Sequence, residues 1–543
     1  MKLYLRATLC LLLITVGGMT FGQEVVQSQA EQYHDFLALI GREVRPYLNY
    51  RTLSDSRWKG DTGAPWSGLD IGSVHSIAKN VRYKLYGPEY FSSYNSDEPY
   101  GQNDGELWQG RGFNASLSLG ARIEAFGFEL TIKPSISFSQ NLPFALLPSA
   151  YDSPYGYYWG NSKDVGVDAP QRFGDQPFFD YSFGDSEARF SWKSLTVGVG
   201  TQQPWIGPGR INSIIQSNNS PPYPKADIGI RKTSVNIADW NLGEVEGRLW
   251  LGALHESAYF DNDPTNNQNL ISGLALAYAP SFLPGLSLSL NRTFLAKWGL
   301  DGLGTIPTLL LFKFNNTGGG DSWDQRISLG FDYLLPSAGV EVYGEAGIND
   351  NPGPTLDSVI RNFSHTVVYT GGIRKAVVTT IPIPIEGELL FEWSNLEMSP
   401  VYSQFLWANS FYMHGQITQG YTNEGQWLGA GTGTGGNSQY LGYTAYFPRG
   451  SASFYLHRYN PDNDFLLRFT TPVVDYPTDN IYGVNFKAVL AIGVSVAYFV
   501  TTNTSASAGA AYVEISDPLY SGTWESSTKL NGFRLEFSIN QYI

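Results

Sequence analysis

The chain has 543 residues, a formal net charge of −14 and a single cysteine. This acidic balance argues against nucleic acid as a partner, and one cysteine cannot form a disulfide framework or a cysteine zinc site. Aromatic residues make up 15% of the sequence beside 59 glycines, a mixture typical of strands, tight turns and the aromatic girdles of membrane barrels.

Residues 1–22 have the order of a secretory signal peptide. Lys2 and Arg6 precede an apolar run at 9–16, and a small-residue exit follows before Gln23. The run is too short for a membrane-spanning helix, which needs about 20 apolar residues. We therefore predict cleavage near Gln23. Cleavage removes the only cysteine and changes the net charge from −14 to −16, because the leader carries two basic residues and no acidic one.

Residues 23–105 are predicted to be a periplasmic helix and a connecting segment. Apolar residues recur with helical spacing over 24–44, and Pro46 follows, so we predict an amphipathic helix against the barrel mouth. The stretch 46–105 is rich in Pro, Gly and Asp and is interpreted as an irregular connection. The alternative is a flexible periplasmic tail.

Apolar and polar residues alternate with period two from about residue 111 to the C-terminus. Residues 113–124 and 533–540 are clear examples, and the longest apolar run, 488–500, is too short for a spanning helix but has large apolar side chains on one strand face. A few such segments would indicate a secreted soluble β-protein. Many in series predict an all-β fold, a transmembrane antiparallel β-barrel over 106–543, because closure pairs every backbone donor and acceptor.

Four stretches interrupt this rhythm and are predicted to be long loops: 143–180, 298–325, 349–364 and 394–440. They are too long for hairpin turns. The first and fourth are rich in Tyr and Trp. Long aromatic loops on a barrel are where binding is expected.

Several ordered motifs carry a family resemblance. WIGPG at 205–209 is followed by SNNSPPYP at 217–224; the other pieces are NDGELWQGRG at 103–112, RFG at 172–174, LSLNRTF at 288–294, DQ at 324–325, YGE at 343–345 and GYTNEGQWLGAG at 420–431. Together they resemble the Wzi-type capsule assembly outer-membrane proteins. Ile206 stands where the family often has an aromatic residue, Ser220 where it usually has Ala, and the C-terminus ends Tyr542-Ile543 where outer-membrane barrels usually end in Phe.

The resemblance implies a barrel of about 18 strands with a small helical periplasmic element, in the outer membrane of a Gram-negative bacterium. It also implies a non-enzymatic role in capsule or exopolysaccharide assembly, in which the protein attaches polysaccharide to the cell surface. The expected partners are capsular or extracellular polysaccharide and outer-membrane lipid, and the expected state is a monomer.

Two clusters combine aromatic faces with amides and a guanidinium, the groups that suit sugar C–H surfaces and hydroxyls. The predicted carbohydrate-binding residues are Trp205, Arg210, Gln216, Asn218, Asn219, Tyr223, Tyr421, Asn423, Gln426 and Trp427. The alternative for the first cluster is an inward-folded loop, shaped by its Gly-Pro-Gly and Pro-Pro pieces, whose amides satisfy its own backbone. For the second cluster, ligand contact and loop packing remain equally open.

An acidic chain needs a local basic patch or bridging cations to bind an anionic glycan. The nearest basic candidates are Arg210, Lys225, Arg231 and Lys232, and the alternative for these is that they are solvated strand ends.

Two other functions remain open. A polar lumen is compatible with a substrate-specific porin or oligosaccharide channel, and a plugged lumen would count against it. An outer-membrane hydrolase would require Ser or Asp within hydrogen-bond reach of one of six histidines, His34, His75, His255, His365, His414 and His457. No HExxH, phosphate loop or GxSxG occurs, so we expect no catalytic residue, no metal site and no cofactor.

Overall fold

The structure is a computed structural model. It describes residues 28–52, 58, 66–71, 74–158, 166–299, 323–349, 367–379, 385–397, 411–465, 487–520 and 528–543. The predicted signal peptide, and most of the predicted loops at 298–325 and 349–364, lie outside these residues. No helix in the described ranges is both long enough and apolar enough to span a membrane.

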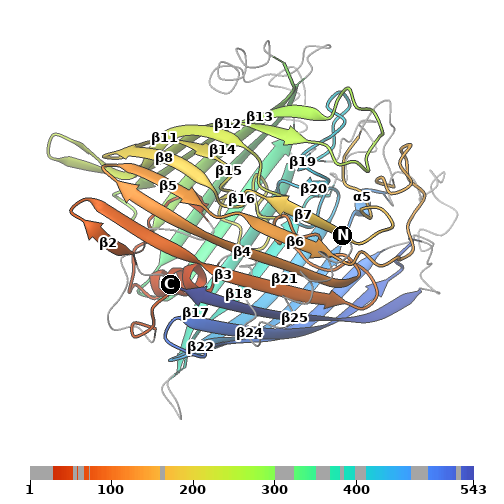
Figure 1. The fold of residues 1–543 in the computed structure, drawn as a ribbon. Coiled ribbons are helices and arrows are strands. Elements are labelled where there is room, and N and C mark those ends of the chain that lie inside the picture. The colour runs from red at the N-terminus through yellow and green to blue at the C-terminus, as the bar shows by residue number, and fades with distance from the viewer. Residues whose placement is uncertain are drawn as a thin grey trace, which may run out of the picture.

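One sheet of antiparallel strands closes on itself as a barrel (Figure 1). Its strands are β2 (His75–Ala78), β3 (Val81–Asn95), β4 (Gly112–Ala125), β5 (Phe128–Ile132), β6 (Ser135–Ser139), β7 (Phe178–Ser182), β8 (Glu187–Trp192), β9 (Leu195–Gly200), β11 (Lys225–Ile237), β12 (Trp240–His255), β13 (Gln268–Pro280), β14 (Leu286–Lys297), β15 (Trp323–Leu335), β16 (Val340–Asn349), β17 (Val367–Thr379), β18 (Ile385–Asn395), β21 (Asn437–Phe447), β22 (Gly450–Asn460), β23 (Ala488–Phe499), β24 (Thr504–Ser516) and β25 (Lys529–Tyr542).

Neighbouring strands follow chain order around the ring, and β25 pairs with β3 to close it. Some short strands share one position in the ring: β5 and β6 both lie beside β4, and β7 and β8 share the next position. β2 and β25 both lie beside β3. The described strands therefore occupy 18 positions. The predicted fold class is therefore confirmed.

The barrel begins before residue 106, where the sequence alone placed its start. β3 is a full wall strand within the segment that was interpreted as an irregular connection. Its pairing with β4 shifts between Tyr86 and Glu89, across Gly87 and Pro88. Since this irregularity breaks the period-two pattern, the strand could not be recognised from alternation.

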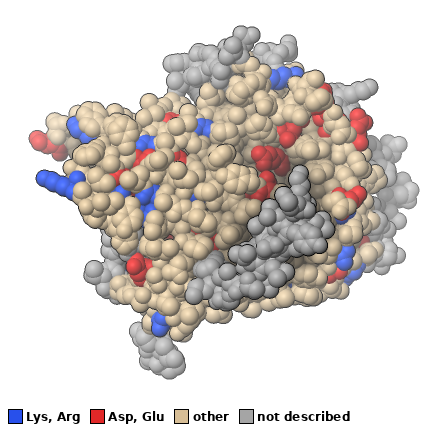
Figure 2. All heavy atoms as spheres, in the orientation of Figure 1, with Lys and Arg blue, Asp and Glu red and all other residues tan. Residues whose placement is uncertain are grey.

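The outward face of the wall is apolar, as the alternation predicts. Leu119 is 54% exposed whereas Asn114 is 0% exposed on the same strand, and Val494 is 54% exposed whereas Ala491 is 0% exposed on β23. Figure 2 shows that uncharged side chains cover most of the visible face. Such a surface is typical of contact with lipid.

The two ends of the barrel differ. Short turns at 336–339, 448–449 and 500–503 lie at one end, the short-turn end, and the described parts of the long connections 140–177 and 396–436 lie at the other, the loop end. In outer-membrane barrels the short turns are periplasmic and the long loops extracellular.

Helix α2 (Gln29–Leu39) lies at the short-turn end, where Figure 1 places it beside the C-terminus. Its Tyr33 and Phe36 pack against Tyr446 at ring-centroid distances of 5.3 and 4.7 Å. The predicted helix over 24–44 is confirmed as an element but is shorter in its described part. Ser28 caps its start by accepting a hydrogen bond from the Glu31 amide at 3.0 Å, and Gly41, at φ 75°, follows its end.

Three segments fill the centre of the lumen, and we call them together the plug: 45–52, 203–224 and 411–436. β1 (Tyr50–Thr52) of the first segment pairs with β10 (Pro204–Ile206) of the second. The third holds the short strands β19 (Thr422–Asn423) and β20 (Gln426–Trp427), and α5 (Asn463–Phe465) lies beyond β22 at the loop end. Apolar residues of all three segments form one buried cluster with wall residues such as Trp250 and Leu295.

Candidate functional site

The first predicted cluster lies on the inward-folded loop 203–224. Trp205 is 1% exposed, and its Nε1 donates a hydrogen bond to the carbonyl of Gly209 at 2.8 Å. The guanidinium of Arg51 lies 5.2 Å from its ring centroid. Gly207 has φ 113°, and a Cβ there would lie 2.6 Å from the Glu345 carboxylate, so the turn requires glycine. Trp205 therefore packs the inside of the plug.

Gln216 and Tyr223 hold the same loop together. The Tyr223 hydroxyl donates to Gln216 Oε1 at 3.1 Å, and the Ile206 amide donates to the Gln216 carbonyl at 3.0 Å. Gln216 is 0% exposed and Tyr223 is 2% exposed. These contacts agree with the alternative to ligand binding, in which the loop folds inward and its polar groups bond within the loop.

Asn218 and Asn219 join separate loops. Asn218 Nδ2 donates to the carbonyl of Asn103 at 3.0 Å, and Asn219 Oδ1 accepts from the Asn103 amide at 2.7 Å. Asn219 Nδ2 also donates to the carbonyl of Gly429 at 2.8 Å. The motifs around residues 103, 218 and 429 therefore meet in space. Asn219 is buried, whereas Asn218 remains partly exposed.

The residues of the second predicted cluster differ in how deeply they are buried. Tyr421 is 0% exposed and its hydroxyl donates to Thr293 Oγ1 at 3.0 Å, while Asn423 Oδ1 accepts from the His255 amide at 3.0 Å. Gln426 and Trp427 are partly exposed. Gln426 Nε2 donates to the carbonyl of Gly105 at 3.3 Å, and Trp427 packs against Tyr157 and Tyr412.

Arg210 lies at the centre of the lumen within a buried ionic network. Its guanidinium is 3.0 Å from Asp35 of α2 and 2.5 Å from Glu341 of β16. Arg45 and Arg374 contact the same two carboxylates at 2.6–2.7 Å. Since Arg210 is engaged there, it belongs to the junction between helix, loop and wall rather than to an outer surface.

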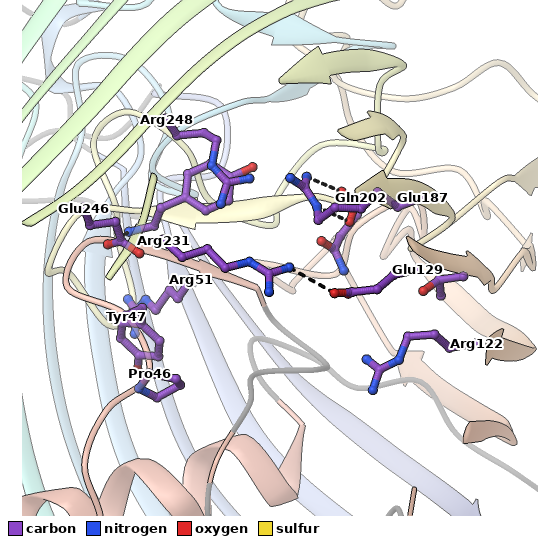
Figure 3. A pocket seen from close by; sticks show the side chains of 13 residues that line it. Pro46, Tyr47, Arg51, Arg122, Glu129, Glu187, Gln202, Arg231, Glu246 and Arg248 are labelled. Carbon is purple, nitrogen blue, oxygen red and sulfur yellow. Dashed lines mark hydrogen bonds and ion pairs between the residues drawn. The ribbon is translucent and has the colours of Figure 1, made fainter. Parts of the chain in front are cut away.

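The other basic candidates also face the inside or the short-turn end. Lys225 is buried and its ammonium donates to the carbonyl of Gln202, while Lys232 donates to the carbonyl of Arg45 at 2.9 Å. Arg231 lines a cavity of about 130 Å³ between the N-terminal segment and the wall (Figure 3). These residues form no basic patch on the loop end.

The cavity of Figure 3 contains several arginines, but carboxylates accompany them. Arg231 is 3.2 Å from Glu129, and Arg189 is 2.6 Å from Glu187. The lining therefore consists largely of ion pairs. The lining has five arginines and three glutamates, and Asp227 behind it pairs with Arg189 and Arg248. The cavity braces the N-terminal segment against the wall.

The loop end carries a partly exposed chain of aromatic rings, which we call the outer aromatic row: Trp108, Phe173, Tyr259 and Tyr155. Consecutive ring centroids are 4.9, 5.8 and 5.7 Å apart, and three loops contribute to the row. Asp175 accepts a hydrogen bond from the Tyr155 hydroxyl, which raises the pKa of Tyr155. Trp108 and Phe173 lie within the motifs NDGELWQGRG and RFG, so the sequence carries a signal for this pair of rings.

Buried carboxyl groups support the loops behind this row. Asp168 is 0% exposed and accepts hydrogen bonds from the amide and the hydroxyl of Ser257, both at 2.6 Å. Burial raises the pKa of Asp168 to about 7 and that of Glu424 to about 7. Burial, with Asp261 nearby, raises the pKa of Glu256 to about 9. With these pKa values, Asp168 and Glu424 change protonation state near neutral pH, whereas Glu256 is protonated there.

The histidines that the structure describes form one serine contact. His457 Nε2 lies 3.0 Å from Ser438 Oγ, and Tyr100 lies on the other ring nitrogen at 3.5 Å. Both members of the pair are buried, at 5% and 1% exposed, so a substrate has no access to the hydroxyl. His365 lies outside the described residues. Among those described, no group of three or more potential ligands is placed to hold a metal ion.

A closed antiparallel barrel with an apolar outer face, a lumen filled by its own chain and long loops at one end defines an outer-membrane β-barrel protein. Residues 92–525 match the family described as capsule assembly protein Wzi. The chain belongs to this family, and it is a capsule assembly protein of the Gram-negative outer membrane. The predicted family is confirmed.

A solved structure shows the same fold, and two others are similar at a lower level. Wzi of Escherichia coli, described as an outer membrane protein involved in group 1 capsule assembly and a carbohydrate-binding β-barrel, is 13% identical, with 83% of each chain covered and a TM-score of 0.53. OccAB2 of Acinetobacter baumannii is 10% identical, with 86% of this chain and 98% of that chain covered, at 0.40. OprB of Pseudomonas putida is 11% identical, with 85% and 94% covered, at 0.36. No curated protein matches the sequence.

Proposed function

We propose that this protein holds capsular or extracellular polysaccharide on the cell surface through its loop end, as a monomer and without catalysis. The observation that carries the proposal is the outer aromatic row, in which four partly exposed rings from three loops contact one another in series. Aromatic faces bind the C–H surfaces of sugars, and nearby amides and carboxylates bind hydroxyls. The carbohydrate binding described for Wzi of E. coli supports the same role.

Three predicted residues belong to this proposed surface. All three are partly exposed: Asn218 and Gln426 bond to the loop at 103–105, and Trp427 packs against Tyr157. The other seven predicted residues are mainly buried or lie inside the lumen, where their side chains bond to the plug and the wall. We propose that these seven maintain the shape of the loops and do not contact polysaccharide.

The porin alternative is disfavoured by the plug. Apolar residues from its three segments pack together and against the wall, and the ionic network closes the space beneath them. A solute would have to displace this packing in order to cross. The hydrolase alternative is disfavoured by the burial of the His457 and Ser438 pair.

The test is the partition of polysaccharide between cells and medium. In a deletion strain we expect the cell-bound glycan to fall and the glycan in the medium to rise, and the intact gene should restore attachment. Tyr259→Ala combined with Tyr155→Ala should behave like the deletion, although the barrel assembles normally. Tyr259→Phe is the matched control because it keeps the ring. An unchanged partition in the deletion strain would overturn the proposal.

A further inference from the structure

A second cavity, which we call the wall cavity, occupies about 340 Å³ of the lumen. Gln29, Gln32 and Asp35 of α2 line one side, Arg210 and Ile211 of the inward loop line another, and strands β17, β18, β21 to β25 and β3 form the outer wall. Because α2 lies at the short-turn end, the cavity reaches that mouth. Its volume falls within the usual range for small-molecule sites, roughly 300–1,000 Å³.

The cavity exists because the wall side chains there are small. Strand register places Thr444 beside Ser453, Ser453 beside Ser495, and Ser507 beside Ser538. Small side chains cannot fill the space between wall and plug. Their hydroxyl groups line it and bond to one another in the pairs Thr444–Ser453 and Ser507–Ser538, at 2.9 and 2.5 Å. Small hydroxyl side chains by themselves indicate only a water-filled lumen.

Two tyrosines add a stacking platform. The rings of Tyr440 and Tyr455 are nearly parallel, at 16°, with centroids 5.9 Å apart. Each ring lies over a glycine: a Cβ on Gly442 would be 2.7 Å from Tyr440 Cε1, and a Cβ on Gly493 would be 2.3 Å from Tyr455 Cε1. The glycines leave room for both rings against the wall, and both tyrosines line the cavity.

Two charged groups at the cavity have hydrogen-bonding capacity to spare. Glu536, whose side chain is 35% exposed, makes a long 3.4 Å contact with Arg534 Nε. Arg210, whose side chain is 9% exposed, has no hydrogen-bond partner for its Nε among the described residues. The cavity thus combines an acceptor, a buried donor, hydroxyl groups and aromatic faces.

We propose that the wall cavity binds a neutral mono- or disaccharide unit stacked on Tyr440 and Tyr455, with its hydroxyls donating to Glu536. The lining contains three carboxylates, of Asp35, Glu388 and Glu536, and two guanidinium groups, so an anionic sugar would meet an unfavourable field. The ligand class rests on the proposed function, but the site is separate: it lies inside the lumen, on residues other than those of the outer aromatic row.

The test is binding of maltose, cellobiose and glucuronate to the purified full-length protein in detergent, by saturation-transfer NMR and calorimetry. Gly493→Ala should lift the Tyr455 ring from the wall and weaken binding of the neutral disaccharides about tenfold. Gly371→Ala is the matched control because its Cβ would meet only an ordinary contact, 3.4 Å from the Tyr343 carbonyl. Tyr455→Leu serves as a second variant that removes the ring without adding a Cβ.

The same titrations are made in the Tyr155→Ala, Tyr259→Ala background, so that the outer aromatic row does not contribute. Binding of a neutral disaccharide in that background that Gly493→Ala and Tyr455→Leu both weaken, and that Gly371→Ala leaves unchanged, would support the site. Absence of neutral disaccharide binding at millimolar concentration, binding of glucuronate alone, or binding in that background that survives both ring variants would overturn it. The partition of polysaccharide in cells reports on the outer aromatic row. A failed wall cavity with normal attachment therefore leaves the proposed function standing.

Discussion

The carboxylate of Asp35 lies 3.0 Å from the guanidinium of Arg210, so the helix at one mouth of the barrel meets the loop that folds in from the other. Arg45 and Arg374 reach the same carboxylate at 2.7 Å. Burial by itself would raise the pKa of Asp35, but the three arginines hold it well below its usual value. The same ionic network therefore holds both helix α2 and the loop 203–224 in place.

Asp35→Asn should lower the free energy of unfolding by about 3–5 kcal/mol, the usual cost of breaking a buried ion pair. The measurement is urea or thermal unfolding of the purified protein in detergent. Asp175→Asn is the control, since Asp175 pairs with Arg172 but its side chain is 66% exposed and such pairs contribute about 1 kcal/mol or less. Equal effects of the two substitutions would contradict a central role for the Asp35 contacts.

Tyr421→Ala should lower the free energy of unfolding by about 3–5 kcal/mol, because it empties a fully buried site and removes the bond to Thr293. Polysaccharide attachment per folded molecule should stay unchanged. The free energy of unfolding and the partition of polysaccharide between cells and medium are both measured on this variant. If polysaccharide attachment is lost while the free energy of unfolding stays normal, Tyr421 belongs to the polysaccharide-binding site.

Stability should increase as the pH falls from about 8 to about 5, because of Asp168. Its pKa in the folded state, about 7, is above the ordinary value of 3.8. Its stabilising contribution is therefore fully present below the unfolded pKa and is lost as the pH rises through the folded pKa. Asp168→Asn should flatten this part of the profile of melting temperature against pH. An unchanged profile would show that Glu424 and Glu256, whose pKa values are also raised, account for it.

The purified protein should show no porin-like conductance steps in planar lipid bilayers, because the plug fills the centre of the described lumen. Asp35→Asn combined with Arg210→Gln should give intermittent conductance, since it releases the contact between helix and loop. Steady large steps from the unaltered protein would favour the channel alternative.

The sequence by itself determined the fold class and the family. Alternation such as that of residues 113–124 is a local property, because a strand in a barrel must place apolar side chains toward lipid and polar ones toward the lumen. The outward exposure of Leu119 and the burial of Asn114 agree with it. The family motifs are equally readable, since they are contiguous. β3 was missed because the irregular pairing at Gly87 and Pro88 interrupts the same local pattern.

Only the tertiary structure decided the role of each polar or aromatic side chain. Trp205 and Trp427 have the same chemistry in the sequence, yet Trp205 is 1% exposed inside the plug, whereas Trp427 is partly exposed at the loop end. The outer aromatic row joins rings from residues 108 to 259, and the Tyr455 platform depends on Gly493 of a neighbouring strand. Depth and contact across strands are set by closure of the barrel and by the direction in which each loop folds, and these are long-range properties that no local pattern encodes.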